Sequence, residues 1–471
     1  PIKWAVDTTP VYDRFGDELT PNSVLYSEWN TFTLQDPNFF FIEPMKIYLP
    51  QGSNTITVFV NEGFFLFGDI TVGNVYEEPL SYSEYLNEHT GSSVENAIEI
   101  AAERYSYESE QNIRSKFVRN PSLTPYSYKN RVLNVLDQSA YRESGDSVTY
   151  IFDVAESGYY NLTIKYMQSE NDELDSQRAI LIDGEIPFAE LESYPFEFSR
   201  KWVNETLHDD EGNFEIYLEA GTHELTLLAN NKKLRDVYHN LLSILDDIDA
   251  IARDVNKITG GLSDRYRDYK LDVYIPTISS DLERLKEELI NEKSQIIELY
   301  GTDDLSIISE INLCLKYFDQ FIENPDEIPP FQYRFNEGTG SIYAKINVIL
   351  PRLIDNPLQM DSLIFHNEDY KLAKANVNIF VRSWESVRAF FYSFVDPKYN
   401  EETEVDDDTV VVWVRQSRLY IQVMQRMIDE GYTEDTGNKV QLSVMPDETK
   451  IVLANAANRT PDAAMGLSVT R

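Results

Sequence analysis

Three aromatic side chains at alternating positions, Tyr194, Phe196 and Phe198, form the first group in this sequence that could do binding chemistry. In an extended chain every second side chain points to the same face, so the three rings would share one face. Such a face offers a platform on which a sugar ring can stack. The same alternation is equally typical of an ordinary strand. We name these residues as candidate ligand-binding residues and keep both interpretations open.

Signatures of catalysis are missing. The sequence contains no Gly-x-x-x-x-Gly-Lys-Ser/Thr phosphate loop, no Gly-x-Gly-x-x-Gly after a strand, no Gly-x-Ser-x-Gly elbow and no His-Glu-x-x-His motif. The five histidines lack metal-ligand spacing, and the single cysteine, Cys314, lies in an apolar stretch that predicts a buried, inert thiol. The 80 acidic residues could include a pair of carboxylates for glycoside hydrolysis, but no pair stands out. We predict a protein that is not an enzyme, with no catalytic residue, no metal site and no cofactor.

The charge balance restricts the partners. The 471 residues carry 80 Asp and Glu against 41 Lys and Arg, a formal net charge of −39. Nucleic-acid binding and electrostatic attachment to anionic lipid both need clustered basic residues, so we expect neither. The negative field favours neutral or cationic ligands. The 13% share of aromatic residues is too high for a disordered acidic chain, and the length predicts several folded domains.

A duplicated segment organises the first half of the chain. Residues 47–58 read IYLPQGSNTITV and residues 216–227 read IYLEAGTHELTL, each a strand, a glycine turn and a second strand. Trp29 and Trp202 precede the two copies at matching positions. We interpret both tryptophans as core residues, with a sugar platform as the alternative. The repeat therefore predicts a duplicated β-domain.

The second copy belongs to a series of short strands over residues 95–230 that predicts a complete β-sandwich. Its opening strand, IEIAAERY at 98–105, and the Gly-Tyr-Tyr strand start at 158–160 resemble those of jelly-roll carbohydrate-binding modules. In some of these modules an acidic residue near the start holds calcium, so the resemblance makes Glu103 a candidate ligand for a structural calcium ion. The first copy shows only the back half of this pattern, so we expect a partial β-sandwich over residues 1–78 and a chain that begins inside a domain.

A helical period replaces the strand pattern from residue 232 to residue 398. Apolar residues recur at helical spacing in five segments, of which the last and longest covers residues 370–394. We predict an all-α helical bundle that serves as a spacer. The acidic run at 401–408 lacks the glycine and the final glutamate of a calcium loop, which favours a solvated linker over residues 399–408.

The last segment, residues 409–471, has the pattern of an α/β fold. Residues 409–414, TVVVWV, form a continuous apolar run of the kind found in buried parallel strands. Two further strands, at 440–444 and 463–467, alternate with helices. This order predicts the first βαβαβ unit of an α/β lobe that is not complete within the sequence.

Three motifs in this segment carry a resemblance: YTEDTGNKV at 432–440, SVMPDETK at 443–450 and TPDAAMG at 460–466. Their order and spacing are similar to the start of the extracellular solute-binding proteins of ABC transporters, especially sugar binders. A second resemblance concerns EGTGS at 337–341 and NPLQMD at 356–361. Both segments are similar to the helical insert of large, multi-module solute-binding proteins from Gram-positive bacteria.

The resemblance implies two α/β lobes that close on a solute by hinge motion. Ligands of open α/β sheets bind beyond the carboxyl ends of the strands, which nominates Arg415, Gln416 and Ser468 as ligand-binding residues. Alternatively, Arg415 and Arg418 balance acidic residues at the start of the following helix.

Taken together, the resemblances imply an exported, cell-surface component of a carbohydrate ABC importer. Its expected partners are a carbohydrate and the permease subunits, and its membrane attachment would be a lipid anchor outside this chain. They also imply a gene that continues beyond Arg471. Two alternatives remain open: a cell-surface glycan-binding or adhesion protein without a transport role, and a glycoside hydrolase that carries binding modules.

Overall fold

The computed structural model divides the chain into two compact units. The structure describes residues 3–13, 16–29, 31–59, 66–73, 78–171, 174–261, 264–393, 408–445, 451, 454–455 and 460–466. The first unit comprises Pro1–Thr9, Thr20–Tyr126 and Val132–Val381, and the second comprises Pro10–Leu19, Ser127–Arg131 and Arg382–Arg471.

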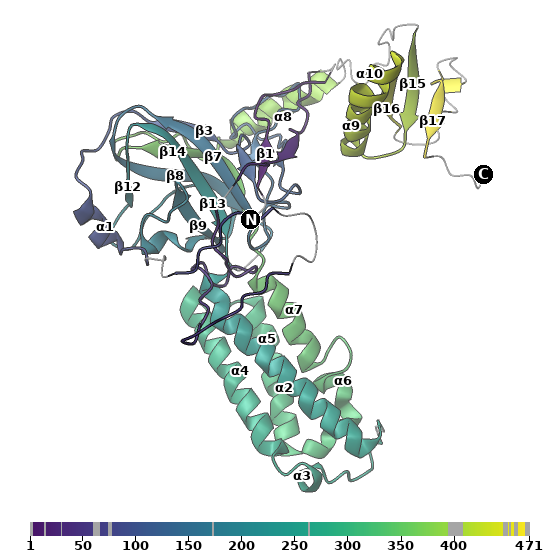
Figure 1. The fold of residues 1–471 in the computed structure, drawn as a ribbon. Helices are drawn as coiled ribbons and strands as arrows, with labels where there is room; N and C mark the ends of the chain where they lie inside the picture. Colours follow the sequence, from purple (N-terminus) through teal and green to yellow (C-terminus); the bar gives the residue numbers. More distant parts are fainter. Residues whose placement is uncertain are drawn as a thin grey trace. The chain divides into compact units, whose positions relative to one another are not determined.

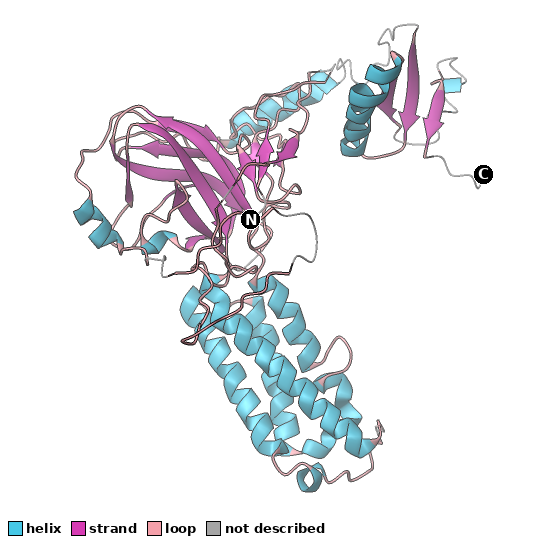
Figure 2. Cartoon of the chain, viewed as in Figure 1, coloured by secondary structure: helices cyan, strands magenta, loops and turns pink. Residues whose placement is uncertain are grey.

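Two antiparallel sheets form a β-sandwich in the first unit (Figure 2). One sheet has the order β10-β9-β13-β7-β4-β1-β2, and its strands are Tyr194–Phe196, Ser176–Ile182, Gly221–Ala229, Ser147–Val154, Tyr107–Glu108, Trp4–Val6 and Ser23–Leu25. The other has the order β11-β8-β14-β6-β5, and its strands are Ser199–Thr206, Gly158–Gln168, Gln359–His366, Val135–Leu136 and Ser115–Lys116. In addition, β12 (Glu215–Leu218) pairs with β8, and β3 (Ile98–Ala101) pairs with β14. Alternating side chains of both sheets fill the core, which confirms the predicted β-sandwich.

The sandwich is completed by a strand that comes after the helical bundle (Figure 1). Strand β14 lies between β8 and β3, so that Leu363 is opposite Ile164 and Ile100. Its Phe365 ring stacks on Phe152 at a centroid distance of 4.9 Å. The boundaries drawn from sequence, 95–230 for the sandwich and 232–398 for the bundle, place this strand in the wrong element. Sequence periodicity is local and does not reveal a partner about 200 residues away.

Four long helices form the bundle in the first unit: α2 (Arg235–Thr259), α4 (Ile278–Tyr300), α5 (Ser306–Glu323) and α7 (Ile342–Leu353). Shorter helices α3 (Leu271–Tyr274) and α6 (Gln332–Phe335) lie in the connections. Gly260 and Gly301 end α2 and α4 with φ angles of 66° and 65°, where other residues would be strained. The inward faces carry leucine and isoleucine at helical spacing, as predicted. The expected last helix over 370–394 is shorter, because α8 begins at Ile379 and ends at Ser393.

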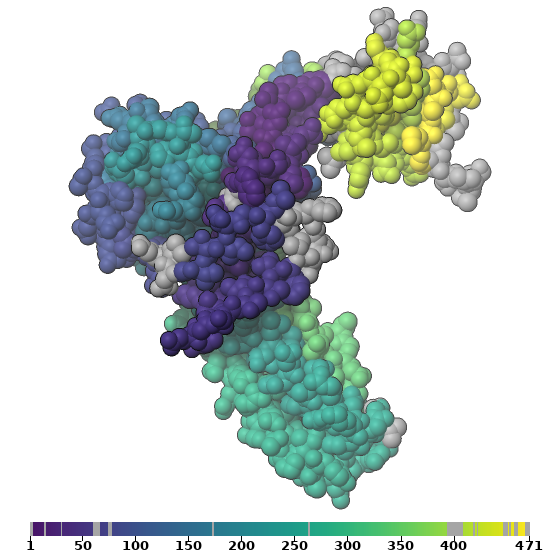
Figure 3. All heavy atoms as spheres, in the orientation of Figure 1, coloured from purple at the N-terminus to yellow at the C-terminus, as the bar shows by residue number. Residues whose placement is uncertain are grey.

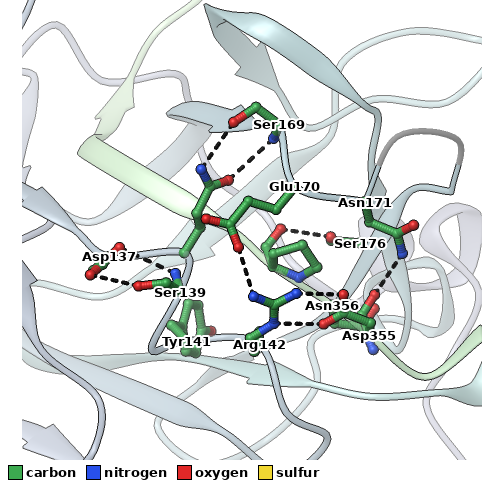
Figure 4. Close-up of polar contacts among 12 residues, drawn as sticks. Asp137, Ser139, Tyr141, Arg142, Ser169, Glu170, Asn171, Ser176, Asp355 and Asn356 are labelled. Atoms are coloured by element: carbon green, nitrogen blue, oxygen red, sulfur yellow. Dashed lines mark hydrogen bonds and ion pairs between the residues drawn. The ribbon is translucent and has the colours of Figure 1, made fainter. Parts of the chain in front are cut away.

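A polar junction fixes the chain where it leaves the bundle and returns to the sandwich (Figure 4). The Arg142 guanidinium donates to both Asp355 carboxylate oxygens at 2.7 and 2.6 Å and to Glu170 at 2.7 Å. The Ser176 hydroxyl donates to the Pro357 carbonyl at 2.7 Å. Bidentate arginine–carboxylate pairs fix orientation as well as distance. The junction therefore holds the end of the bundle against the strands of the sandwich.

The first repeat copy has a different structure from its partner. Only β1 and β2 are regular strands within the described residues of 1–78, and they extend the sheet of the sandwich beyond β4. Residues 47–59 contain neither helix nor strand, and they lie on the surface of the molecule (Figure 3). The structure thus places no sandwich of its own in the described part of this segment.

The second unit contains a parallel sheet with the order β16-β15-β17 (Lys439–Val444, Thr409–Val414 and Ala463–Met465). Helix α9 (Arg418–Met427) follows β15 and continues through a π-helical turn, η5 (Ile428–Thr433), into α10 (Glu434–Thr436). Val412 and Val414 of β15 are buried, as the continuous apolar run predicts. Residues 399–407 of the expected acidic linker lie outside the described residues.

Candidate functional site

The carboxyl ends of two parallel strands meet at Arg415. Its backbone N–H donates to the carbonyl of Met465, the last residue of β17, at 3.1 Å. Gly466 follows with a φ of 81°, and a Cβ there would come within 3.2 Å of the Arg415 Cβ. The order β16-β15-β17 thus brings Arg415 and residue 466 to one edge, the edge at which open α/β sheets bind ligands.

Two of the three nominated residues lie within the described part of this edge. Arg415 and Gln416 are exposed at the end of β15, where a planar guanidinium and an amide can both donate hydrogen bonds to ligand oxygens. Ser468 lies outside the described residues. All three residues remain predictions.

The three alternating aromatic residues do not form an exposed platform. Tyr194 is 4% exposed and Phe196 is fully buried, with the Phe196 ring 5.0 Å from that of Tyr166. Phe198 is half-buried, and the Arg200 guanidinium lies 5.6 Å from its ring centroid. Strand β10 directs Tyr194 and Phe196 into the core, as expected for a plain strand. The Tyr194 hydroxyl nevertheless reaches a pocket.

That pocket has a volume of about 430 Å³ and lies beside β10 and β11. It is lined by Tyr166, Glu190, Tyr194, Pro195, Glu197, Glu205, His208, Asp209, Asp210 and Phe214. The Tyr194 hydroxyl donates to Glu205 Oε1 at 2.7 Å, and His208 Nδ1 lies 3.2 Å from the same oxygen. Burial raises the pKa of Glu205, and burial together with the Glu205 charge raises that of Tyr194. This set of hydroxyl, carboxylate and imidazole groups can exchange hydrogen bonds with a polar ligand.

The sequence did not reveal Glu205 and His208 as members of this pocket. Glu205 and His208 lie three and six positions after Trp202 in the repeated block. This position is the only indication of them that the sequence contains. Their proximity to Tyr194 depends on the pairing of β11 with β8 and of β10 with β9. Strand pairing of this kind is a tertiary property.

The remaining candidates have structural surroundings. Glu103 is buried, with Oε1 3.7 Å from Arg104 Nε. In the described part of the chain, no group of three or more His, Cys, Asp or Glu side chains is arranged to hold a metal ion. Cys314 is buried, and this burial raises the pKa of its thiol to about 12. Among the described helices, none combines the length and apolarity required to cross a membrane.

Comparison with known families identifies the helical region. Residues 236–353 match the family model of the bacterial solute-binding protein, 4-helix bundle domain. This segment begins within α2 and ends with α7, so the match covers the whole observed bundle. The chain is therefore multi-domain, with antiparallel sandwich sheets and a helical region similar to that of solute-binding proteins. A search of curated proteins finds no match to the chain.

Solved structures resemble parts of the chain. A cycloisomaltooligosaccharide glucanotransferase from Paenibacillus sp. is 22% identical over 30% of this chain and 17% of its own, with a TM-score of 0.22. The GH26-CBM35 β-(1,4)-mannanase of Podospora anserina is 12% identical over 29% of this chain and 25% of its own, with a TM-score of 0.22. A family 35 carbohydrate binding module from Clostridium thermocellum is 17% identical over 30% of this chain and 85% of its own, with a TM-score of 0.19.

Proposed function

We propose that the chain is part of the exported substrate-binding component of a carbohydrate ABC importer, which captures an oligosaccharide by hinge closure. The observation that carries this proposal is the match of residues 236–353 to the 4-helix bundle domain of bacterial solute-binding proteins. The parallel order β16-β15-β17 supports it, because open parallel sheets bind ligands beyond the carboxyl ends of their strands.

In this proposal, Arg415 and Gln416 bind the captured sugar. Neutral sugars offer hydroxyl groups that accept hydrogen bonds from a guanidinium or an amide. Closure of a second lobe would exclude water and strengthen these bonds. The pocket at Tyr194 and Glu205 would serve as an accessory glycan site on the sandwich. The protein binds its ligand without chemical change, and permease subunits receive the sugar at the outer face of the membrane.

The test is uptake of labelled oligosaccharides by a strain that lacks the gene. Complementation with the natural gene should restore uptake, and a gene with Arg415→Ala and Gln416→Ala should restore less of it. The matched control is Glu430→Ala, an exposed residue that follows α9 and so lies away from the carboxyl ends of the strands. Uptake that does not depend on the gene would contradict the importer role.

The pocket on the sandwich favours a second candidate, a surface glycan-binding protein without a transport role. Under this alternative, loss of the gene would leave uptake unchanged, and Glu205→Gln would reduce binding of the protein to polysaccharide. Release of reducing sugar by the purified protein would instead indicate a glycoside hydrolase and would contradict the proposal that the chain is not an enzyme.

A further inference from the structure

Glu292 interrupts the apolar stripe of α4. Leu289 and Ile296 of this helix are fully buried, and Glu292 lies between them in the same stripe with only 2% of its surface exposed. Asn240 of α2 donates to Glu292 Oε1 at 2.8 Å, whereas the buried Oε2 has no hydrogen-bond partner. A buried carboxylate is normally satisfied on both oxygens. The bundle therefore keeps an incompletely satisfied carboxylate at a position that a leucine would fill.

A groove of about 520 Å³ lies between α2 and α4, and Glu292 is part of its lining. The two helices run side by side in the bundle (Figure 1). The other groove residues carry only amide, hydroxyl or carboxylate groups, among them Asn240, Ser243, Glu288, Asn291 and Gln295. Of the described residues that line the groove, none is basic or aromatic. Glu292, whose Oε2 is buried and unsatisfied, thus belongs to the wall of a polar groove.

The charges around the groove determine which ligand it fits. Glu288 is paired with Arg284 at 2.7 Å, and Arg284 also pairs with Asp247, so one cation serves two carboxylates. Glu298 adds a further carboxylate to the lining. Burial raises the pKa of Glu292, as do the neighbouring carboxylates of Asp236 and Glu288. An anion would be repelled here, and a sugar would find no aromatic ring on which to stack. A cation would supply both the missing opposite charge and the missing hydrogen bond.

We propose that this groove binds a primary ammonium group, with the Glu292 carboxylate as its counter-ion and the amide and hydroxyl oxygens of the walls as further acceptors. In the described part of the chain, no cluster of side chains has the arrangement of a metal site, which favours an organic cation. An ammonium group has three donors and no acceptor, which matches a lining rich in oxygen atoms. This site is separate from the strand ends and does not depend on the importer role.

Two kinds of molecule carry such a group, a polyamine and an amino sugar. Calorimetric titration of the whole protein with spermidine and with glucosamine at physiological ionic strength distinguishes them. One of the two should bind saturably with a stoichiometry of one. Glu292→Gln should weaken that binding by at least about tenfold, the value of one charge-assisted hydrogen bond.

The matched control is Glu283→Gln, an exposed position on the same helix that does not line the groove. It removes the same charge, so it measures the nonspecific attraction of cations to a chain with a net charge of −39. Its affinity should stay within about twofold of the natural protein. Equal losses in both variants, or no saturable binding of either amine, would overturn the proposal.

A second variant separates a binding role from a structural one. Glu292→Leu should abolish amine binding and raise the midpoint of thermal unfolding, because it replaces a buried charge with an apolar side chain. A lowered midpoint would show that the carboxylate holds the helices together and would likewise overturn the proposal. Glu292→Gln keeps the shape of the side chain, so its binding data remain informative whether Glu292→Leu raises or lowers the unfolding midpoint.

Discussion

The two repeat copies have similar sequences and opposite surroundings. Leu218 in the second copy is 1% exposed, whereas the matching Leu49 in the first copy is 39% exposed. In the second copy, β12 pairs with β8, and β13 pairs with β7 and β9. The structure describes no such partners for residues 47–58. Strand formation in these copies therefore depends on neighbouring strands, and a strand pattern alone does not produce a strand.

The largest expected effect comes from truncating the matched leucines. Leu218→Ala removes a side chain from the sandwich core and should lower the free energy of unfolding by about 2–5 kcal/mol. Leu49→Ala should lower it by less than about 1 kcal/mol, because much of that side chain already contacts water. Urea denaturation followed by circular dichroism measures both values. Equal losses would mean that the first copy is packed as tightly as the second.

An effect of intermediate size on stability is expected at Glu108. This residue lies in β4, the strand to which β1 of the first repeat region is paired. Strand β1 pairs with β4, which places Trp4 opposite Glu108. Burial raises the pKa of Glu108 to about 7 from the ordinary glutamate value of 4.5. A carboxyl whose pKa is raised by folding stabilises the native state while protonated, and this contribution is lost as pH rises from about 4.5 to about 7.

Glu108→Gln removes this pH dependence while keeping the shape of the side chain. The variant should match the natural protein near pH 4.5 and exceed its unfolding free energy by about 1–3 kcal/mol at pH 8. Denaturant titrations at several pH values test the prediction. A difference that is constant with pH would contradict a buried, raised carboxyl at this junction.

The smallest effect is a spectroscopic contrast between the matched tryptophans. Trp202 is 3% exposed and Trp29 is 74% exposed. The prediction that both are core residues therefore agrees with the structure for Trp202 and fails for Trp29, which no strand in the described part of the chain covers. Trp29→Phe should reduce the amount of fluorescence that acrylamide quenches, and Trp202→Phe should leave that amount almost unchanged. The reverse result would mean that Trp29 is covered.

Local patterns predicted those elements whose signal is contained within them. The apolar run of β15 identified a buried parallel strand, and the helical period identified α2 and α4. Strand β14 was missed because its partner β8 lies on the other side of the inserted bundle. The contact between Tyr194 and Glu205 was missed for a similar reason, since it depends on how two sheets are paired. Long-range pairing is what a single sequence reveals least.

The most direct test of the account is calorimetric titration of the protein, expressed from its complete gene, with short oligosaccharides and with polysaccharides. We predict saturable binding of a short oligosaccharide with a stoichiometry of one at the α/β lobe, reduced by Arg415→Ala. Binding of polysaccharide alone, unaffected by Arg415→Ala and reduced by Glu205→Gln, would contradict the importer role and assign the carbohydrate site to the sandwich.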